Sequence, residues 1–168
     1  LSPFVNDIAV TEYTIPYTLV GMISTIPLSL LTVAIPRLSG YIGLGDKEAY
    51  LSTFKETVRV YFSILLPMAV GVLVLSKEIM WLYTKDVYTY AYAVLALAAV
   101  ARIVYGFESV VTNLMMYVWG FEKRLTLYLL YGGIFNGISN FLLVFTGKFS
   151  AFSSLFTTMV ACMLVIVL

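Results

Sequence analysis

The stretch AYAVLALAAV at residues 91–100 is a run of apolar and aromatic residues, and it decides the fold class. A strand of a transmembrane barrel would alternate apolar and polar residues over about ten positions, because one face meets lipid and the other the lumen. This stretch does not alternate. A helix satisfies its backbone hydrogen bonds internally, and can therefore carry apolar side chains on every face in lipid. The stretch predicts a membrane-spanning α-helix.

The composition of the whole chain agrees with this prediction. Of its 168 residues, 61% are hydrophobic and only 11% are charged, and the mean hydropathy is +0.97. Soluble domains carry about 25% charged residues, and a soluble chain of this size cannot hide so much apolar surface from water. These values exclude a water-soluble fold and a disordered chain. A net charge of +1 also argues against nucleic acid as a partner.

Five stretches are long enough to cross a bilayer, since a core of about 30 Å needs about 20 mostly apolar residues. We therefore expect an all-α polytopic membrane protein with about five transmembrane helices. Pro27 and Pro67 lie inside the first two stretches and predict bends there. Because the sequence begins at Leu1 and stops within an apolar run, we expect it to be part of a longer protein. The expected spans are 15–35, 58–75, 90–119, 125–145 and 150–168, with a cytoplasmic connection at 37–57.

The positively charged residues between the spans predict the orientation. Six Lys and Arg residues, counting Arg59 at the start of the second span, lie on one side and three on the other, and the more positive side faces the cytoplasm. The charges of the 37–57 connection alternate in sign, which predicts a short amphipathic helix on the membrane surface after the turn at Gly43-Leu44-Gly45. The connections at 37–57 and 120–124 are thus expected inside, and the N-terminal segment, 76–89 and 146–149 outside.

A polar stripe runs along the third span. Arg102 is expected near the middle of the bilayer, where burying a charge costs at least about 2.5–3.5 kcal/mol. A helix keeps such a residue when it faces a wet cavity or a structural partner on another helix, and both alternatives stay open here. The residues of the stripe recur at helical spacing and are Arg102, Tyr105, Gly106, Ser109 and Asn113. We interpret Arg102, Tyr105, Ser109 and Asn113 as candidate substrate-binding residues of a cavity.

Glu108 does not belong to this stripe. It lies six residues after Arg102, about 240° around the helix axis, so the two side chains are not expected to pair. Glu108 is a candidate ion-coupling carboxylate. The alternative is a structural residue that reaches the membrane interface or bonds to Thr112.

The fourth and fifth spans carry small and polar residues that predict helix contacts. Gly133 and Gly137 are spaced for a close approach of two helices. Asn136 and Asn140 are spaced for hydrogen bonds to a neighbouring helix. The fifth span begins with the similarly spaced Ser150, Ser154 and Thr158.

The sequence contains no recognisable enzyme site. It has no histidine and a single cysteine, Cys162, which excludes a histidine-based triad, an internal disulfide and a cysteine zinc cluster. It also lacks paired carboxylates, a phosphate-binding loop and a nucleophile elbow. No cofactor or metal is therefore expected. Bent helices with isolated interior charges indicate a transporter.

Several motifs, in order and spacing, resemble those of the lipid-linked oligosaccharide (Wzx-type) flippases, a family of the multidrug/oligosaccharidyl-lipid/polysaccharide exporter superfamily. The segment Pro36-Arg37-Leu38-Ser39, followed by Gly43-Leu44-Gly45-Asp46, is similar to a cytoplasmic loop motif of that family. Pro36, Arg37, Ser39 and Asp46 are its motif residues here. The later similar segments are 66–71, 75–79, 120–123, 136–140 and 153–158.

The resemblance implies 12–14 helices in two lobes around a central cavity, with this chain supplying helices eight to twelve. It also implies translocation of undecaprenyl-pyrophosphate-linked oligosaccharide repeat units across the bacterial cytoplasmic membrane by alternating access, often coupled to an ion gradient. The implied partners are the lipid-linked oligosaccharide, membrane lipid, an N-terminal lobe and the polysaccharide polymerase machinery.

Three alternatives stay open from the sequence. A cation-coupled multidrug exporter of the same superfamily would use intramembrane acids, and Glu108 is the only clear one. A membrane-embedded glycan polymerase or acyltransferase would present larger outside loops than the short ones expected here. The chain is also expected to be inert if separated from its opposite lobe.

Overall fold

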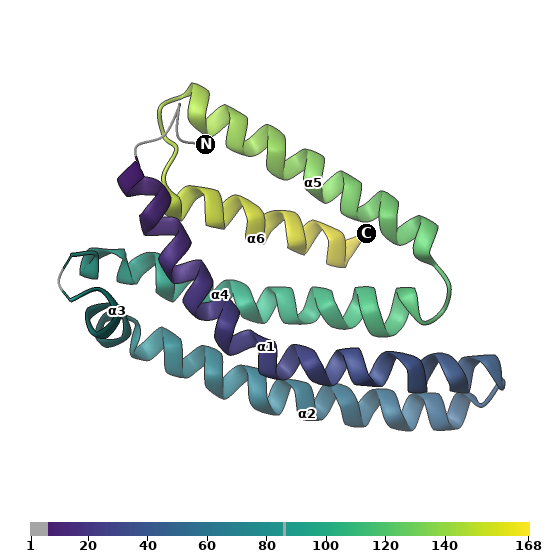
Figure 1. Cartoon of the computed structure of the whole chain (residues 1–168). Coiled ribbons are helices and arrows are strands. Elements are labelled where there is room, and N and C mark those ends of the chain that lie inside the picture. The colour runs from purple at the N-terminus through teal and green to yellow at the C-terminus, as the bar shows by residue number, and fades with distance from the viewer. Residues whose placement is uncertain (1–6, 86) are drawn as a thin grey trace.

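The computed structural model describes residues 7–85 and 87–168, which form helices joined by short turns (Figure 1). No strand occurs in these two ranges. The helix bounds are α1 Asp7–Gly43, α2 Lys47–Val74, α3 Ser76–Thr84, the 3₁₀ helix η1 Thr89–Ala91, α4 Tyr92–Ser109, the π-helix η2 Val110–Tyr117, α5 Glu122–Phe145 and α6 Ala151–Val167.

Four helical segments in the described part of the chain are long and apolar enough to cross a bilayer. They are Val10–Gly43, Lys47–Val74, Tyr92–Tyr117 and Glu122–Phe145. The fifth predicted span corresponds to α6, which is apolar but has only 17 residues, the short end of the usual range. The chain is an all-α, multi-pass membrane protein, as predicted.

The connection expected at 37–57 is mostly helical in the structure. α1 continues to Gly43 and α2 begins at Lys47, so the turn between them is only three residues long and contains Gly45 with a φ of 73°. The separate amphipathic helix is therefore wrong, because its residues form the first turns of α2. Extending an existing helix gains one hydrogen bond per residue, whereas a break before the apolar run would lose several. The expected 76–89 loop likewise contains α3.

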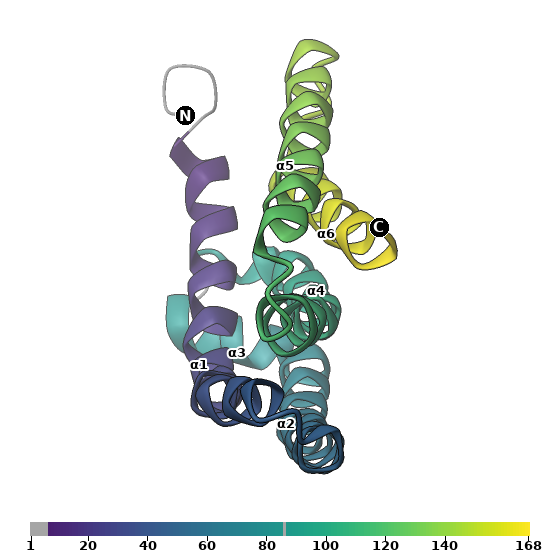
Figure 2. The same ribbon diagram turned by 90° about the vertical axis from the view of Figure 1, so that its right-hand side faces the viewer.

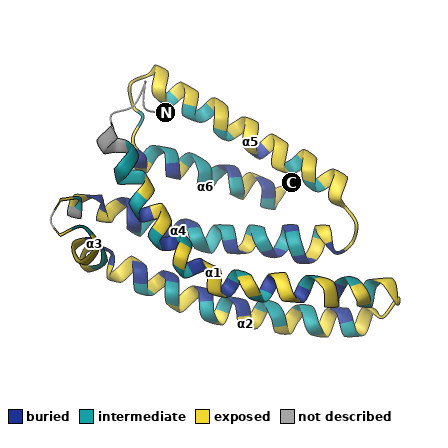
Figure 3. Ribbon diagram, viewed as in Figure 1, coloured by how far each residue is buried: buried dark blue, intermediate teal, exposed yellow. Residues whose placement is uncertain are grey.

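The helices are arranged with α4 in the middle. α1 and α2 pack on one side of α4 and α6 packs on the other, with α5 outermost against α6 (Figures 1 and 2). One buried cluster, which includes Val20, Leu95 and Leu155, joins α1, α4 and α6. A second, which includes Leu38, Tyr61 and Leu114, joins α1, α2 and η2. Most of α5 is exposed in this chain, and Gly132 is its one buried residue (Figure 3).

α1 bends about midway along its length (Figure 1). The stretch that bends carries Pro27, which is fully buried. A proline in a helix interior removes one backbone hydrogen bond and clashes with the preceding turn, so the predicted bend has its expected cause. The bend places the N-terminal part of α1 across α4 and α6, and the C-terminal part alongside α2.

Candidate functional site

Arg102 lies between two helices in the middle of a membrane span. Its position in the segment Tyr92–Tyr117 places it about 15 Å from the start of that helix. The guanidinium carbon lies 5.3 Å from the centre of the Tyr17 ring, on α1, and 5.6 Å from the centre of the Tyr105 ring, on α4. The charge is therefore held against aromatic faces contributed by two different helices.

These aromatic contacts leave the charge of Arg102 uncompensated. Among the residues whose side chains the structure describes (10–85, 87–88 and 90–168), it forms no ion pair and donates no hydrogen bond. Aromatic rings attract a cation through the negative charge of their faces, but they do not neutralise it. The guanidinium consequently keeps its hydrogen-bond donors and its full charge for an anionic group.

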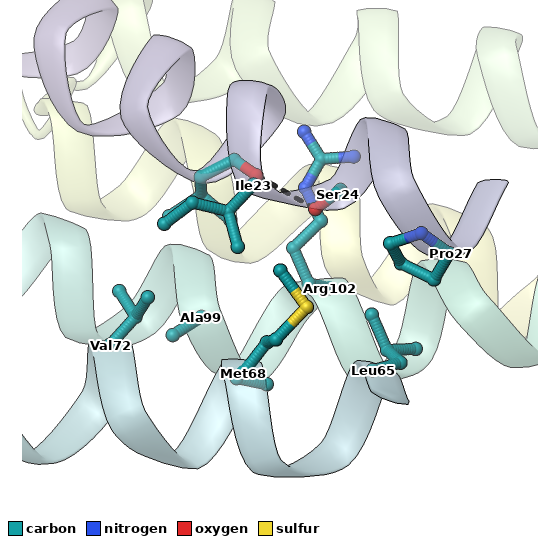
Figure 4. Close-up of a pocket in the computed structure, with 10 residues that line it drawn as sticks. Ile23, Ser24, Pro27, Leu65, Met68, Val72, Ala99 and Arg102 are labelled. Carbon is teal, nitrogen blue, oxygen red and sulfur yellow. Dashed lines mark hydrogen bonds between the residues drawn. The ribbon is translucent and has the colours of Figure 1, made fainter. Parts of the chain in front are cut away.

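Two small adjoining pockets meet at Arg102, and both are also lined by Ser24 and Leu65. Figure 4 shows the first, where the Arg102 side chain rises from α4 beside Ser24 of α1. The second, which we call the Arg102 pocket, is partly open to the outside and has a volume of about 40 Å³. Its lining residues are Ser24, Leu28, Tyr61, Leu65, Arg102, Tyr105, Gly106 and Ser109.

Tyr105 carries a polar atom without a partner. Its hydroxyl oxygen is buried and makes no hydrogen bond with any described residue. A buried hydroxyl without a partner costs about 1–3 kcal/mol, and such groups call for a specific explanation. A bound ligand that supplies the missing hydrogen bond is one explanation, and the neighbouring guanidinium favours an anionic one.

The structure brings part of the predicted stripe to the Arg102 pocket. Arg102, Tyr105 and Ser109 line it together with Gly106, but Asn113 does not. The Asn113 amide instead donates to the Ser109 carbonyl oxygen at 2.9 Å. The prediction assumed 3.6 residues per turn throughout, whereas the backbone becomes a π-helix at Val110. The wider turn rotates later side chains away from the α-helical face.

Glu108 lies in a different pocket from Arg102, and the helical spacing predicted that the two side chains do not pair. The pocket that contains Glu108 opens between α4, α5 and α6. Thr112 does bond at Glu108, but through its hydroxyl to the backbone carbonyl oxygen at 2.8 Å, not to the carboxylate. The pocket is lined by Glu108, Leu129, Gly132, Gly133, Asn136, Thr158, Ala161, Cys162 and Val165.

Polar residues of α5 and α6 join these helices, as predicted for the two asparagines. Asn136 donates to the Thr158 hydroxyl at 3.3 Å, and the Thr157 hydroxyl donates to Asn140 at 3.0 Å. The close approach, however, occurs at Gly132, where an added Cβ would lie 2.7 Å from Val165. The prediction for Gly133 and Gly137 is wrong, because nothing lies within 4 Å of an added Cβ at either position.

The motif residues of the resemblance occupy helix ends and not a long loop. Pro36, Arg37 and Ser39 lie within the last turns of α1. Arg37 is exposed and lines an open groove between α1 and α2. Asp46 is the N-cap of α2, and its carboxylate accepts a hydrogen bond from the Ala49 backbone at 3.0 Å.

The sequence pattern does not indicate the residues that other helices bring to Arg102. Tyr17 and Ser24 come from α1, and Tyr61 comes from α2. The only local signal is the spacing of Tyr13 and Tyr17, which are one helical turn apart and stack with ring centres separated by 5.5 Å. That spacing does not indicate which helix they contact.

A family model described as "Lipid II flippase MurJ" matches residues 12–114 of the chain. The match covers more than half of the chain and includes every residue that lines the Arg102 pocket. No curated protein and no solved structure matches the chain.

Proposed function

Because the chain belongs to the MurJ family of lipid II flippases, we propose that it carries a polyprenyl-pyrophosphate-linked saccharide across the bacterial cytoplasmic membrane. The family is one of transporters and not of enzymes. It belongs to the superfamily that the sequence motifs resemble, although those motifs suggested the oligosaccharide branch and the match names the lipid II branch.

The uncompensated charge of Arg102 in the membrane is the observation that carries this proposal. A pyrophosphate-linked sugar cannot cross hydrocarbon unaided, because its charges and hydroxyls would lose their hydration. A guanidinium matches phosphate oxygens in geometry and charge. Tyr105 and Ser109, which line the Arg102 pocket, both carry a hydroxyl group that can bond a phosphate oxygen.

The remaining predicted site residues have roles outside this pocket in our proposal. Glu108 is the ion-coupling carboxylate, since it is half-buried in a separate, mostly apolar pocket. Asn113 supports the site from the π-helix through its bond to Ser109. Arg37 and Asp46 lie at the cytoplasmic end of α1 and α2, where the positive charges of the sequence put the inner side of the membrane.

The saccharide is the finer part of the proposal. Lipid II and an undecaprenyl-pyrophosphate-linked oligosaccharide repeat unit share the polyprenyl chain and the pyrophosphate, so Arg102 does not discriminate between them. The family match supports lipid II, and the motif around Pro36 supports an oligosaccharide repeat unit destined for a surface polysaccharide polymerase. The native full-length protein is expressed in one strain depleted of its lipid II flippase and in another lacking its oligosaccharide flippase, and the strain that recovers identifies the cargo.

Substitution of Arg102 tests the proposal. In the recovered strain, we expect Arg102→Gln to abolish accumulation of the cargo in the outer leaflet while the protein level stays normal, and Arg102→Lys to restore part of it. Arg59→Gln is the matched control, because Arg59 is an exposed arginine on α2. Full transport by Arg102→Gln would refute the proposed role of Arg102, and recovery of neither strain would refute the proposed function.

A further inference from the structure

We infer that Tyr17 is a positioning residue for Arg102, and that the face of its aromatic ring holds the guanidinium ready to meet a pyrophosphate. This inference rests on the proposed function. It concerns a residue on α1 that does not itself line the Arg102 pocket. This residue fixes the position of the Arg102 guanidinium, which does line it.

The Arg102 guanidinium contacts ring faces on two helices. The ring centre of Tyr17 lies 5.3 Å from the guanidinium carbon, closer than the 5.6 Å of Tyr105. Tyr105 is on the same helix as Arg102 and moves with it. Tyr17 belongs to α1, so it is the contact that fixes the guanidinium relative to a second helix.

One face of α1 forms a slot for the guanidinium. Tyr17, Gly21 and Ser24 are spaced by four and three residues, and thus lie on one face of the helix. An added Cβ on Gly21 would lie 3.7 Å from an Arg102 Nη atom, so the guanidinium lies against α1 where a side chain is missing. The ring of Tyr17 is on one side of this slot, and Ser24 is on the other.

An aromatic ring differs from a carboxylate as a partner for this cation, because it leaves the charge of the cation in place. A carboxylate at this place would pair with Arg102 and compete with an incoming phosphate. A ring face lowers the cost of holding the cation in the membrane without cancelling its charge. The Ser24 hydroxyl does not compete either, because it donates to the Val20 carbonyl oxygen at 2.7 Å.

Tyr17 also connects the cation to the bend of α1. It lies in the part of α1 that precedes Pro27, and that part crosses α4. A change in the bend would carry Tyr17 away from Arg102, whereas Tyr105 would stay with it. Occupation of Arg102 by an anion and the angle of α1 are therefore linked through this one ring.

A fluorination series at position 17 tests the inference. Phenylalanine and its mono-, di- and trifluoro derivatives are incorporated at Tyr17 in the native full-length protein. Each fluorine withdraws electron density from the ring face while changing its shape little. In lipid nanodiscs, we expect Tyr17→Phe to bind undecaprenyl pyrophosphate like the wild type. Affinity should then fall with each added fluorine, by about two- to fivefold across the series.

The matched control is the same series at Tyr13, which stacks on Tyr17 but makes no cation–π contact with Arg102. The Tyr13 series should give a constant affinity. The unfolding temperature is measured for every variant, because a purely structural role of Tyr17 would change with ring size and not with ring charge.

The possible outcomes separate this inference from the proposed function. A flat affinity across the Tyr17 series, or an equal decline in the Tyr13 series, overturns the inference even when Arg102→Gln abolishes binding. Wild-type binding by Arg102→Gln would instead remove Arg102 from the site, and with it the basis of both proposals. A decline confined to Tyr17 supports the positioning role.

Discussion

The Tyr50 hydroxyl on α2 donates a hydrogen bond of 3.0 Å to the backbone carbonyl oxygen of Leu114 in η2. Both residues are buried, and Leu114 belongs to a π-helix within a membrane span. The backbone of a π-helix departs from the regular α-helical hydrogen-bond pattern. Irregular backbone is tolerated at membrane depth where neighbouring helices satisfy its polar groups. Tyr50 provides such a bond from another helix.

Removing this hydroxyl should destabilise the protein. Tyr50→Phe keeps the ring but takes away the donor, and we expect a loss of about 1–3 kcal/mol because a buried carbonyl loses a partner. The measurement is the unfolding temperature of the purified protein in detergent. Tyr117→Phe is the control, since Tyr117 is 48% exposed. Equal unfolding temperatures for the two variants would contradict the prediction.

The hydroxyl of Tyr105 should behave in the opposite way. Because this group has no partner among the described residues, Tyr105→Phe should leave the stability of the unliganded protein unchanged or raise it. Affinity for undecaprenyl pyrophosphate should fall by about two- to tenfold if the ligand supplies the missing bond.

Titration of undecaprenyl pyrophosphate into nanodiscs measures this affinity, and Tyr131→Phe on the exposed face of α5 serves as the comparison. Binding by Tyr105→Phe that equals the wild type would show that the hydroxyl does not contact the anion.

Two glycines of α5 should respond differently to the same substitution. Gly132→Ala places a methyl group 2.7 Å from Val165 Cγ2, and overpacking of this kind costs about 1–3 kcal/mol. The added Cβ of Gly137→Ala has no atom within 4 Å. The better helix propensity of alanine should therefore stabilise the protein by about 0.4–1 kcal/mol. Unfolding temperatures of both variants test this pair. A gain in stability for Gly132→Ala would show that α6 can shift away from α5.

Asp46 should act through helix capping. Asp46→Ala removes the acceptor for the Ala49 backbone N–H and should cost about 1 kcal/mol. Asp46→Ser supplies another capping oxygen and should keep the wild-type stability. Both are measured by thermal unfolding and by cargo transport in the recovered strain. If Asp46→Ser is stable but does not transport, the carboxylate has a role beyond capping α2.

The helical spacing of the sequence was informative for the site only as far as the backbone stays regular. It separated Arg102 from Glu108, which line different pockets. It failed for Asn113, because the π-helix begins at Val110 and changes the angle per residue. It also failed for Gly133, since the spacing identifies a small-residue face but not the side on which α6 lies.

The sequence by itself determined that this chain is a helical, multi-pass membrane protein with a cation deep in one span. Hydropathy, length and helical period are properties of single segments. They are sufficient to identify a membrane-spanning helix, because such a helix forms its backbone hydrogen bonds internally. Only the tertiary structure decided that the Tyr17 ring contacts Arg102 and that Tyr50 bonds Leu114, 64 positions away. These contacts depend on the bend of α1 and on the packing of α1 and α2 against α4, which arise from many weak interactions between distant segments.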